Sequence, residues 1–212
     1  NFSEQLSPLV ISAMLEKALK VQNIFLVVGQ PGSGKSTFLK MLAETDPRNF
    51  TINTDDFNHQ LRPLLKAKFG QEDLIKVALE NETEMKKVIA KSWLELLKES
   101  LKSAPAGANV FVEIPYGLQA DKALWRFIGG KVIYIGCDDE NLNLERLKNR
   151  GTPELAKFIE KIPDRSATAK IARQHRLQVG YINTDCPLGN LKDKATNLNA
   201  LIWGGSGHAH HL

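Results

Sequence analysis

Short apolar runs alternate with amphipathic stretches along the chain, and turn residues follow most of the runs. Four runs rich in β-branched and aromatic residues predict strands over Ile24–Val28, Phe50–Asn53, Val110–Glu113 and Lys131–Gly136. Two further runs are candidates for a fifth strand, namely Val179–Ile182 and Leu198–Trp203.

Helical periodicity occurs before and between these runs, over Leu9–Val21, Lys35–Glu44 and Glu84–Leu101. The apolar residues of the third segment fall on one stripe and predict a core-facing helix: Met85, Val88, Ile89, Trp93, Leu96, Leu97 and Leu101. Because strands alternate with helices, the sequence predicts an α/β fold in which helices cover both faces of a five-stranded, mostly parallel sheet.

The segment from residue 141 to 162 has the pattern of a helix, a break and a second helix. Gly151 suits a helix end, Thr152 an N-cap and Pro153 a first helical turn. We therefore expect one domain over residues 1–203, with an N-terminal helix and a helical lid near residues 141–165. The Gly- and His-rich residues 204–212 are expected to form a flexible tail.

Composition excludes several classes of protein. With 42% hydrophobic and 25% charged residues, the chain is neither fibrous nor a disordered tail. Its apolar runs are far shorter than the ~20 residues of a membrane helix. No secretory pattern is present, and Cys137 and Cys186 lack the spacing of a zinc site or a disulfide framework. We expect a cytoplasmic protein with no membrane partner.

The net charge of +4 is concentrated in one part of the chain. Between Glu145 and Arg176 there are nine cations and four anions, whereas the remainder is close to neutral. This distribution places the positive surplus on the expected lid and does not form an extended stripe, so nucleic acid is not an expected partner.

A phosphate-binding motif follows the first predicted strand and begins the next helix. Its residues match G-x-x-x-x-G-K-[ST] in full: Gly29, Gln30, Pro31, Gly32, Ser33, Gly34, Lys35, Ser36 and Thr37. The glycines let backbone N–H groups turn toward phosphate oxygens, and Lys35 is expected to reach the β- and γ-phosphates. Ser36 is the expected Mg²⁺ ligand. The motif predicts a three-layer P-loop fold of the nucleoside-kinase type that binds ATP or GTP, and we expect ATP and Mg²⁺ as the cofactors.

Carboxylates stand at the ends of the next two strands, where an acceptor hydroxyl would lie. Asp55 follows Phe50–Asn53 and is our candidate base, and Asp56 is expected to cap the following helix or to lie near the metal. Glu113 ends its strand at the edge where open α/β sheets bind ligands. Arg62 is a candidate contact for an anionic substrate.

Two arginines of the expected lid are candidate catalytic residues. Arg146 and Arg150 are four positions apart and therefore share one face of a helix. From that face they would neutralise the charge that develops on a transferred phosphoryl group.

Taken together, the loop Gly29–Thr37, Asp55-Asp56-Phe57, Arg62-Pro63, Glu113 and the segment Glu145–Gly151 resemble the zeta toxin family of P-loop kinases. That resemblance covers about residues 24–165. It implies transfer of phosphate from ATP to a sugar hydroxyl of UDP-N-acetylglucosamine or a related nucleotide-sugar. It also implies Asp55 as the base, and a protein antitoxin or inhibitor as a partner.

Other functions stay open from the sequence. The segments Asn53–Phe57 and Arg146–Gly151 are also similar to the bacteriophage-type polynucleotide 5′-kinase domain, although Asn58 stands where that family has arginine. A nucleoside or antibiotic kinase is a further alternative. From another class, the chain could be a nucleotide-gated interaction module that has no small-molecule substrate.

Overall fold

The computed structural model describes residues 23–29, 32–114, 131–137, 139–149 and 178–203. The strands are β1 (Asn23–Val28), β2 (Asn49–Ile52), β3 (Asn109–Glu113), β4 (Lys131–Gly136) and β5 (Gln178–Asn183). The helices are α3 (Lys35–Thr45), α4 (Thr54–Phe69), α5 (Leu74–Glu80), α6 (Glu82–Ser103), α8 (Glu140–Asn149) and α11 (Leu188–Trp203). Expectations for Leu9–Val21, for the lid beyond Asn149 and for residues 204–212 lie outside these ranges.

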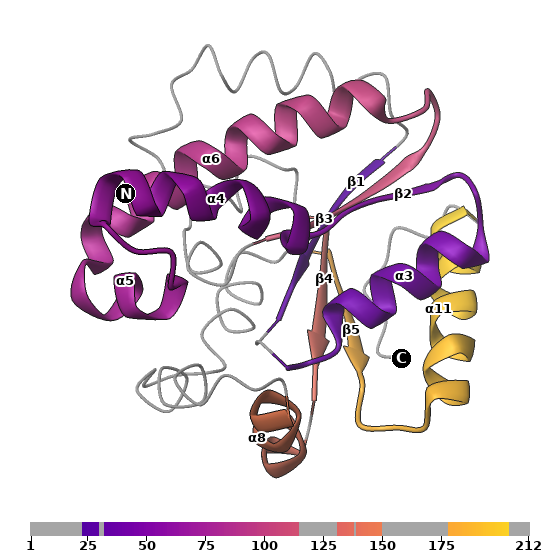
Figure 1. The fold of residues 1–212 in the computed structure, drawn as a ribbon. Helices are drawn as coiled ribbons and strands as arrows, with labels where there is room; N and C mark the ends of the chain where they lie inside the picture. The colour runs from indigo at the N-terminus through magenta and orange to yellow at the C-terminus, as the bar shows by residue number, and fades with distance from the viewer. Residues whose placement is uncertain (1–22, 30–31, 115–130, 138, 150–177, 204–212) are drawn as a thin grey trace.

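The five strands form one parallel sheet in the order β2-β3-β1-β4-β5 (Figure 1). The predicted α/β class and strand number are therefore confirmed, and every strand pair is parallel. The strand β1 is central: β2 and β3 lie on one side of it, and β4 and β5 lie on the other. The order of the strands therefore reverses at β1. The carboxyl end of β1 is thus at the switch point where such sheets bind ligands.

Two hydrophobic cores lie on opposite faces of the sheet. One face packs against α4, α5 and α6, and its core includes Trp93, Phe57 and Leu65. The other face packs against α3 and α11 through residues such as Phe38 and Leu191. Figure 1 shows the two groups of helices on either side of the strands. Parallel strands buried on both faces explain why their sequences read as continuous apolar runs.

The predicted helix boundaries are close to those observed, but one predicted strand is wrong. Lys35–Glu44 corresponds to α3, and Glu84–Leu101 lies within α6, whose apolar stripe packs into the core as expected. Val179–Ile182 lies in β5. Leu198–Trp203, in contrast, forms the end of α11. Leu191, Ala195 and Leu198 are buried at helical spacing, so packing against α3 selects the helix.

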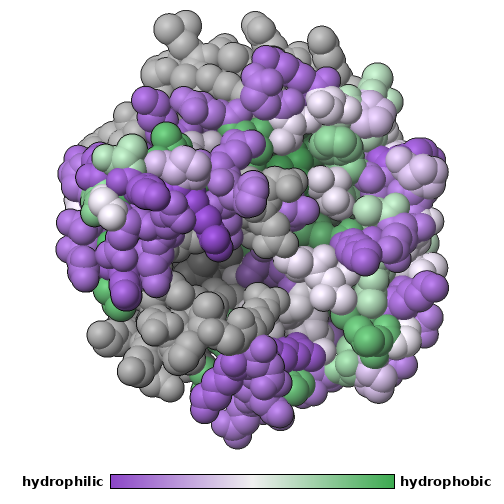
Figure 2. Space-filling view, viewed as in Figure 1, coloured by the Kyte–Doolittle hydropathy of each residue, from purple (hydrophilic) through white to green (hydrophobic). Residues whose placement is uncertain are grey.

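Polar residues cover the outer surfaces of these layers. Figure 2 shows hydrophilic residues over α4 and α5 and again over α8. Exposed charged residues on these elements include Lys66, Lys68, Glu80 and Lys148. None of the helices within the described ranges is long and apolar enough to cross a membrane.

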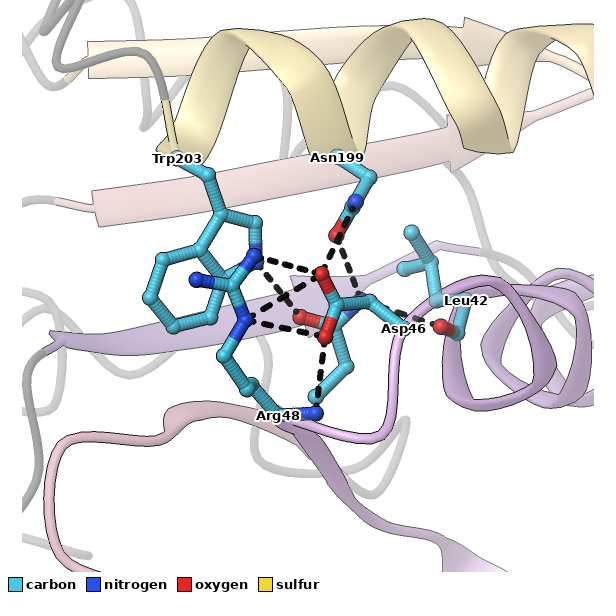
Figure 3. Close-up of polar contacts among 6 residues, drawn as sticks. Leu42, Asp46, Arg48, Asn199 and Trp203 are labelled. Atoms are coloured by element: carbon cyan, nitrogen blue, oxygen red, sulfur yellow. Dashed lines mark hydrogen bonds and ion pairs between the residues drawn. The ribbon is translucent and has the colours of Figure 1, made fainter.

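An ion pair fixes the turn between α3 and β2, at the end of the sheet opposite the P-loop. Arg48 Nη2 donates to Asp46 Oδ2 at 2.7 Å, and the guanidinium carbon lies 3.8 Å from the centre of the Trp203 ring (Figure 3). Trp203 is the last residue of α11. Hydrogen bonds from Arg48 lower the pKa of Asp46 to about 2.

The amide of Asn49 completes this contact between α11 and the turn. Its Nδ2 donates to the carbonyl of Leu42 at 3.0 Å and to Oδ1 of Asn199 at 2.7 Å. Its Oδ1 accepts a hydrogen bond from Trp203 Nε1 at 3.2 Å (Figure 3). We call Asp46, Arg48, Asn49, Asn199 and Trp203 the α11 clamp. It joins residues about 150 positions apart in the sequence.

Candidate active site

The phosphate-binding motif forms the connection from β1 to α3. Gly32 and Gly34 have φ angles of 78° and 86°, a region that residues with a Cβ rarely adopt. Gly34 is the N-cap of α3, so the first N–H groups of this helix have no acceptor within the helix itself. Such a helix end attracts anions. Gln30 and Pro31 lie outside the described residues.

The interior of the loop has the donors that a polyphosphate requires. Lys35 is the first residue of α3, and its buried Nζ donates to the carbonyl of Gly29 at 2.7 Å. The hydroxyl of Ser33 is fully buried and has no hydrogen-bond partner within the described part of the chain. A buried hydroxyl without a partner is costly, and a phosphate oxygen would supply one. The loop therefore fits the triphosphate of a nucleotide, with the half-buried Ser36 next to Lys35 to bind Mg²⁺.

Glu113 lies beside the start of this loop. It is the last residue of β3, it is only 4% exposed, and it pairs in register with Val27 of β1. Ile114 N donates to the carbonyl of Val27 at 3.0 Å and continues the pairing beyond the strand. The expected position of Glu113 at the carboxyl edge is therefore confirmed. Its role toward a substrate stays a prediction.

The predicted base and its neighbour lie at the start of α4, at the carboxyl end of β2. The helix begins at Thr54, so Asp55 and Asp56 are in its first turn. The expectation that Asp56 caps the helix is wrong, because the helix starts earlier than the sequence indicated. Negative residues in a first turn are still stabilised by the helix dipole.

Arg62 lies on the same helix as Asp55, seven residues later. Seven residues correspond to nearly two turns, so both residues occupy one side of α4 about 10 Å apart along its axis. The Arg62 side chain is exposed. The structure therefore places Arg62 on the side of α4 that carries Asp55.

Arg146 of α8 is linked to the phosphate-binding loop through Thr184, a residue that the sequence analysis did not identify. Arg146 Nη1 donates to Thr184 Oγ1 and Nη2 donates to the Thr184 carbonyl, both at 3.1 Å. Thr184 follows β5 and is 2% exposed, and its hydroxyl is 2.6 Å from the carbonyl oxygen of Ser33. Arg150, the second expected arginine, lies outside the described residues.

Helix α8 also packs directly against the loop. A Cβ placed on Gly32 would lie 2.5 Å from Asn143 Oδ1 and 2.8 Å from Leu147 Cγ. Asn143 and Leu147 are both buried and lie one turn apart on α8. The sequence carries no local signal for this contact, because Gly32 and α8 are more than 100 residues apart.

Cys137 lies close to Arg146 at the end of β4. Cys137 follows β4, and burial raises the pKa of its thiol, although the nearby charge of Arg146 acts in the opposite direction. The thiol is therefore protonated at neutral pH and is a poor nucleophile.

Solved structures with a similar fold exist, although sequence comparisons find no match. The sequence matches no protein-family model, and no curated protein matches it. A shikimate kinase from Acinetobacter baumannii, solved in complex with shikimate, is 22% identical with a TM-score of 0.53, over 90% of this chain and 98% of that chain. This chain has a P-loop kinase fold. The protein TT1252 from Thermus thermophilus is 21% identical with a TM-score of 0.59, over 87% of this chain and 98% of that chain.

The P-loop kinase fold accounts for where the expected site residues lie. Lys35, Asp55, Glu113 and Arg146 come from four separate segments that all reach, or flank, the carboxyl edge of one sheet. Sequence identity of this level shows the fold alone. The nucleotide-sugar acceptor that the zeta toxin resemblance implied stays a prediction.

Proposed function

We propose that this protein is a kinase that transfers the γ-phosphate of ATP to a hydroxyl of a small metabolite. The observation that supports the proposal is that two carboxylate residues stand at the carboxyl ends of β2 and β3, the edge of the sheet at which the P-loop follows β1. Asp55 follows β2 and Glu113 ends β3, and β3 pairs with β1 immediately before the loop. A P-loop alone binds nucleotide, whereas transfer to a hydroxyl also needs a group that orients that hydroxyl and accepts its proton.

Each residue then has a defined task. Lys35 and the backbone of residues 32–36 hold the phosphates, and Asp55 accepts the proton of the acceptor hydroxyl. Arg146 neutralises charge on the transferred group, since a guanidinium has five N–H donors and can bind Thr184 and a phosphate oxygen at once. Mg²⁺ would be held by Ser36 and the nucleotide, and it supplies additional neutralisation of the phosphate charge.

The class of acceptor is inferred from similarity to other proteins. The resemblance to zeta toxins favours a nucleotide-sugar such as UDP-N-acetylglucosamine, and a protein inhibitor would accompany that function. The similar fold of a shikimate kinase makes shikimate a second compound to test. Both are small molecules with hydroxyl groups. Localisation in the cytoplasm, where ATP is abundant, is part of the same proposal.

A labelled-phosphate assay tests the reaction. The protein is incubated with [γ-³²P]ATP, Mg²⁺ and a metabolite extract, and in parallel with UDP-N-acetylglucosamine or shikimate alone. We expect one labelled metabolite to form. Hydrolysis of ATP with no labelled metabolite would contradict the kinase proposal and favour a nucleotide-gated interaction module.

Two matched pairs of variants test the residue assignments in that assay. Asp55→Asn should lower kcat by about 100-fold or more through loss of the base, whereas Asp193→Asn on the exposed surface of α11 should leave it unchanged. Lys35→Met should abolish transfer, whereas Lys40→Met, exposed on the same helix, should not. Equal activity of Asp55→Asn and wild type would refute the base assignment.

A further inference from the structure

Thr184 lies where β5 and the P-loop meet, and its backbone is held firmly. Thr184 N donates to the carbonyl of Gly136 at 2.8 Å, which continues the pairing of β4 with β5 beyond the last strand residue. The side chain is buried. The position of its hydroxyl is therefore set by the sheet.

The hydroxyl has a defined direction of donation. Its single hydrogen can go to the carbonyl of Ser33 at 2.6 Å or to that of Gly136 at 3.2 Å, and the shorter contact is the stronger one. Arg146 has only donors, so it must donate to the lone pairs of the same oxygen. The hydrogen bonds therefore run in one direction, from Arg146 to Thr184 and from Thr184 to Ser33. Bonds aligned in this way strengthen one another.

This contact fixes one peptide group of the P-loop. A trans peptide is planar, so its C=O and N–H point in opposite directions. With the Ser33 carbonyl bound by Thr184, the N–H of Gly34 must point away from Thr184. The methyl group of Thr184 also lies beside Gly34, because Cγ2 is 3.3 Å from the place that a Cβ on Gly34 would occupy. Glycine at a positive φ gives a peptide freedom to rotate, and Thr184 opposes that rotation.

We propose that Thr184 is a positioning residue that turns the Gly34 N–H toward the bound phosphates and links this peptide to Arg146. The proposal deepens the nucleotide-binding part of the proposed function and rests on it. Arg146 then has a second role besides neutralising the transferred phosphoryl group. Its charge polarises the Thr184 hydroxyl, and this hydroxyl in turn polarises the Ser33–Gly34 peptide. Removal of the hydroxyl should weaken nucleotide binding even when the shape of the side chain is kept.

The test compares Thr184→Val, which keeps the shape and loses the hydroxyl, with Thr184→Ser, which keeps the hydroxyl. ADP affinity is measured by calorimetry. We expect Thr184→Val to raise the Kd for ADP about tenfold and Thr184→Ser to change it by about twofold or less. Similar Kd values for wild type and Thr184→Val would overturn the proposal.

The Gly34 N–H can also be observed directly. Carbonyl-¹³C serine combined with ¹⁵N-glycine gives selected NMR signals from two peptides, Ser33–Gly34 and Ser206–Gly207. Gly207→Ala removes the second signal and assigns the first. Thr184→Val should shift the Gly34 amide proton to lower frequency, and Thr184→Ser should return it toward wild type. An unchanged Gly34 signal in Thr184→Val would refute the orientation.

Different failures are distinguishable. If the wild-type protein binds no ADP, the proposed function fails, while the Gly34 signal of the nucleotide-free protein still tests the role of Thr184. If Thr184→Val does not fold, Thr184→Ala removes the same hydroxyl and places no methyl group against the Ser33 carbonyl, and it is compared with Thr184→Ser by both measurements.

Discussion

Substitution of Gly32 by alanine tests whether α8 packs on the P-loop as closely as the structure shows. The new Cβ would lie 2.5 Å from Asn143 Oδ1 and 2.8 Å from Leu147 Cγ, and both partners are buried. The backbone at Gly32 also has a φ of 78°, which is unfavourable for alanine. Two costs are therefore expected, one from the backbone and one from the contact.

Gly107 separates these two costs. Its φ is also 78°, and a Cβ there would meet nothing within 4 Å. Gly107→Ala should lose about 1 kcal/mol of unfolding free energy from the backbone alone. Gly32→Ala should lose about 2–4 kcal/mol, because overpacking of a filled site typically adds about 1–3 kcal/mol. The effect of Gly→Ala on the unfolded chain is common to both variants and cancels in the comparison.

Urea unfolding followed by circular dichroism measures both variants. We expect the midpoint to be clearly lower for Gly32→Ala than for Gly107→Ala, with similar m-values. ADP affinity should fall for Gly32→Ala and stay the same for Gly107→Ala. If the two variants lose the same stability, α8 does not contact the loop and the argument is wrong.

Two further predictions concern the α11 clamp. Because Arg48 depresses the pKa of Asp46 to about 2, the ion pair stabilises the fold above pH 4 and is lost as the pH falls through 2. Wild type should exceed Asp46→Asn by about 1 kcal/mol in urea unfolding at pH 6 and match it near pH 2; a pH-independent difference would contradict this. Asn49→Asp replaces a buried donor by an acceptor that faces Leu42 O and Asn199 Oδ1, so it should cost about 2–3 kcal/mol. Asn197→Asp, exposed on α11, is the control and should change stability by less than about 0.5 kcal/mol.

The sequence predicted the sheet well because parallel strands buried on both faces have continuous apolar runs. It predicted α3 and α6 because their apolar residues repeat at helical spacing over a long segment. It did not predict the full length of α4, because Pro63 lies inside this helix and proline usually ends one. The buried residues Phe57, Leu61 and Leu65 nevertheless repeat at helical spacing. The end of α11 was mistaken for a strand because a short apolar run fits both kinds of element.

The sequence could predict only those parts of the candidate site whose residues are close together in the chain or directly follow a strand. Gly29–Thr37 is recognisable because all its chemistry lies within nine consecutive residues. Asp55 and Glu113 could be placed because each directly follows or ends a strand. Thr184 could not be found in this way, because its partner Ser33 is 151 residues away and only the strand order brings them together.

The bond between Thr184 and Ser33 has a consequence for synthesis on the ribosome. At about 5–20 residues per second, the 151 residues between the two take about 8–30 s to make. For all but the first four residues of that interval, the nascent chain already has every residue of the nucleotide motif. It has neither the strand end that orients the Gly34 N–H nor the helix whose last residue, Trp203, anchors the α3–β2 turn. The contact that holds the Ser33 carbonyl therefore forms only after β5 and Thr184 have left the ribosome.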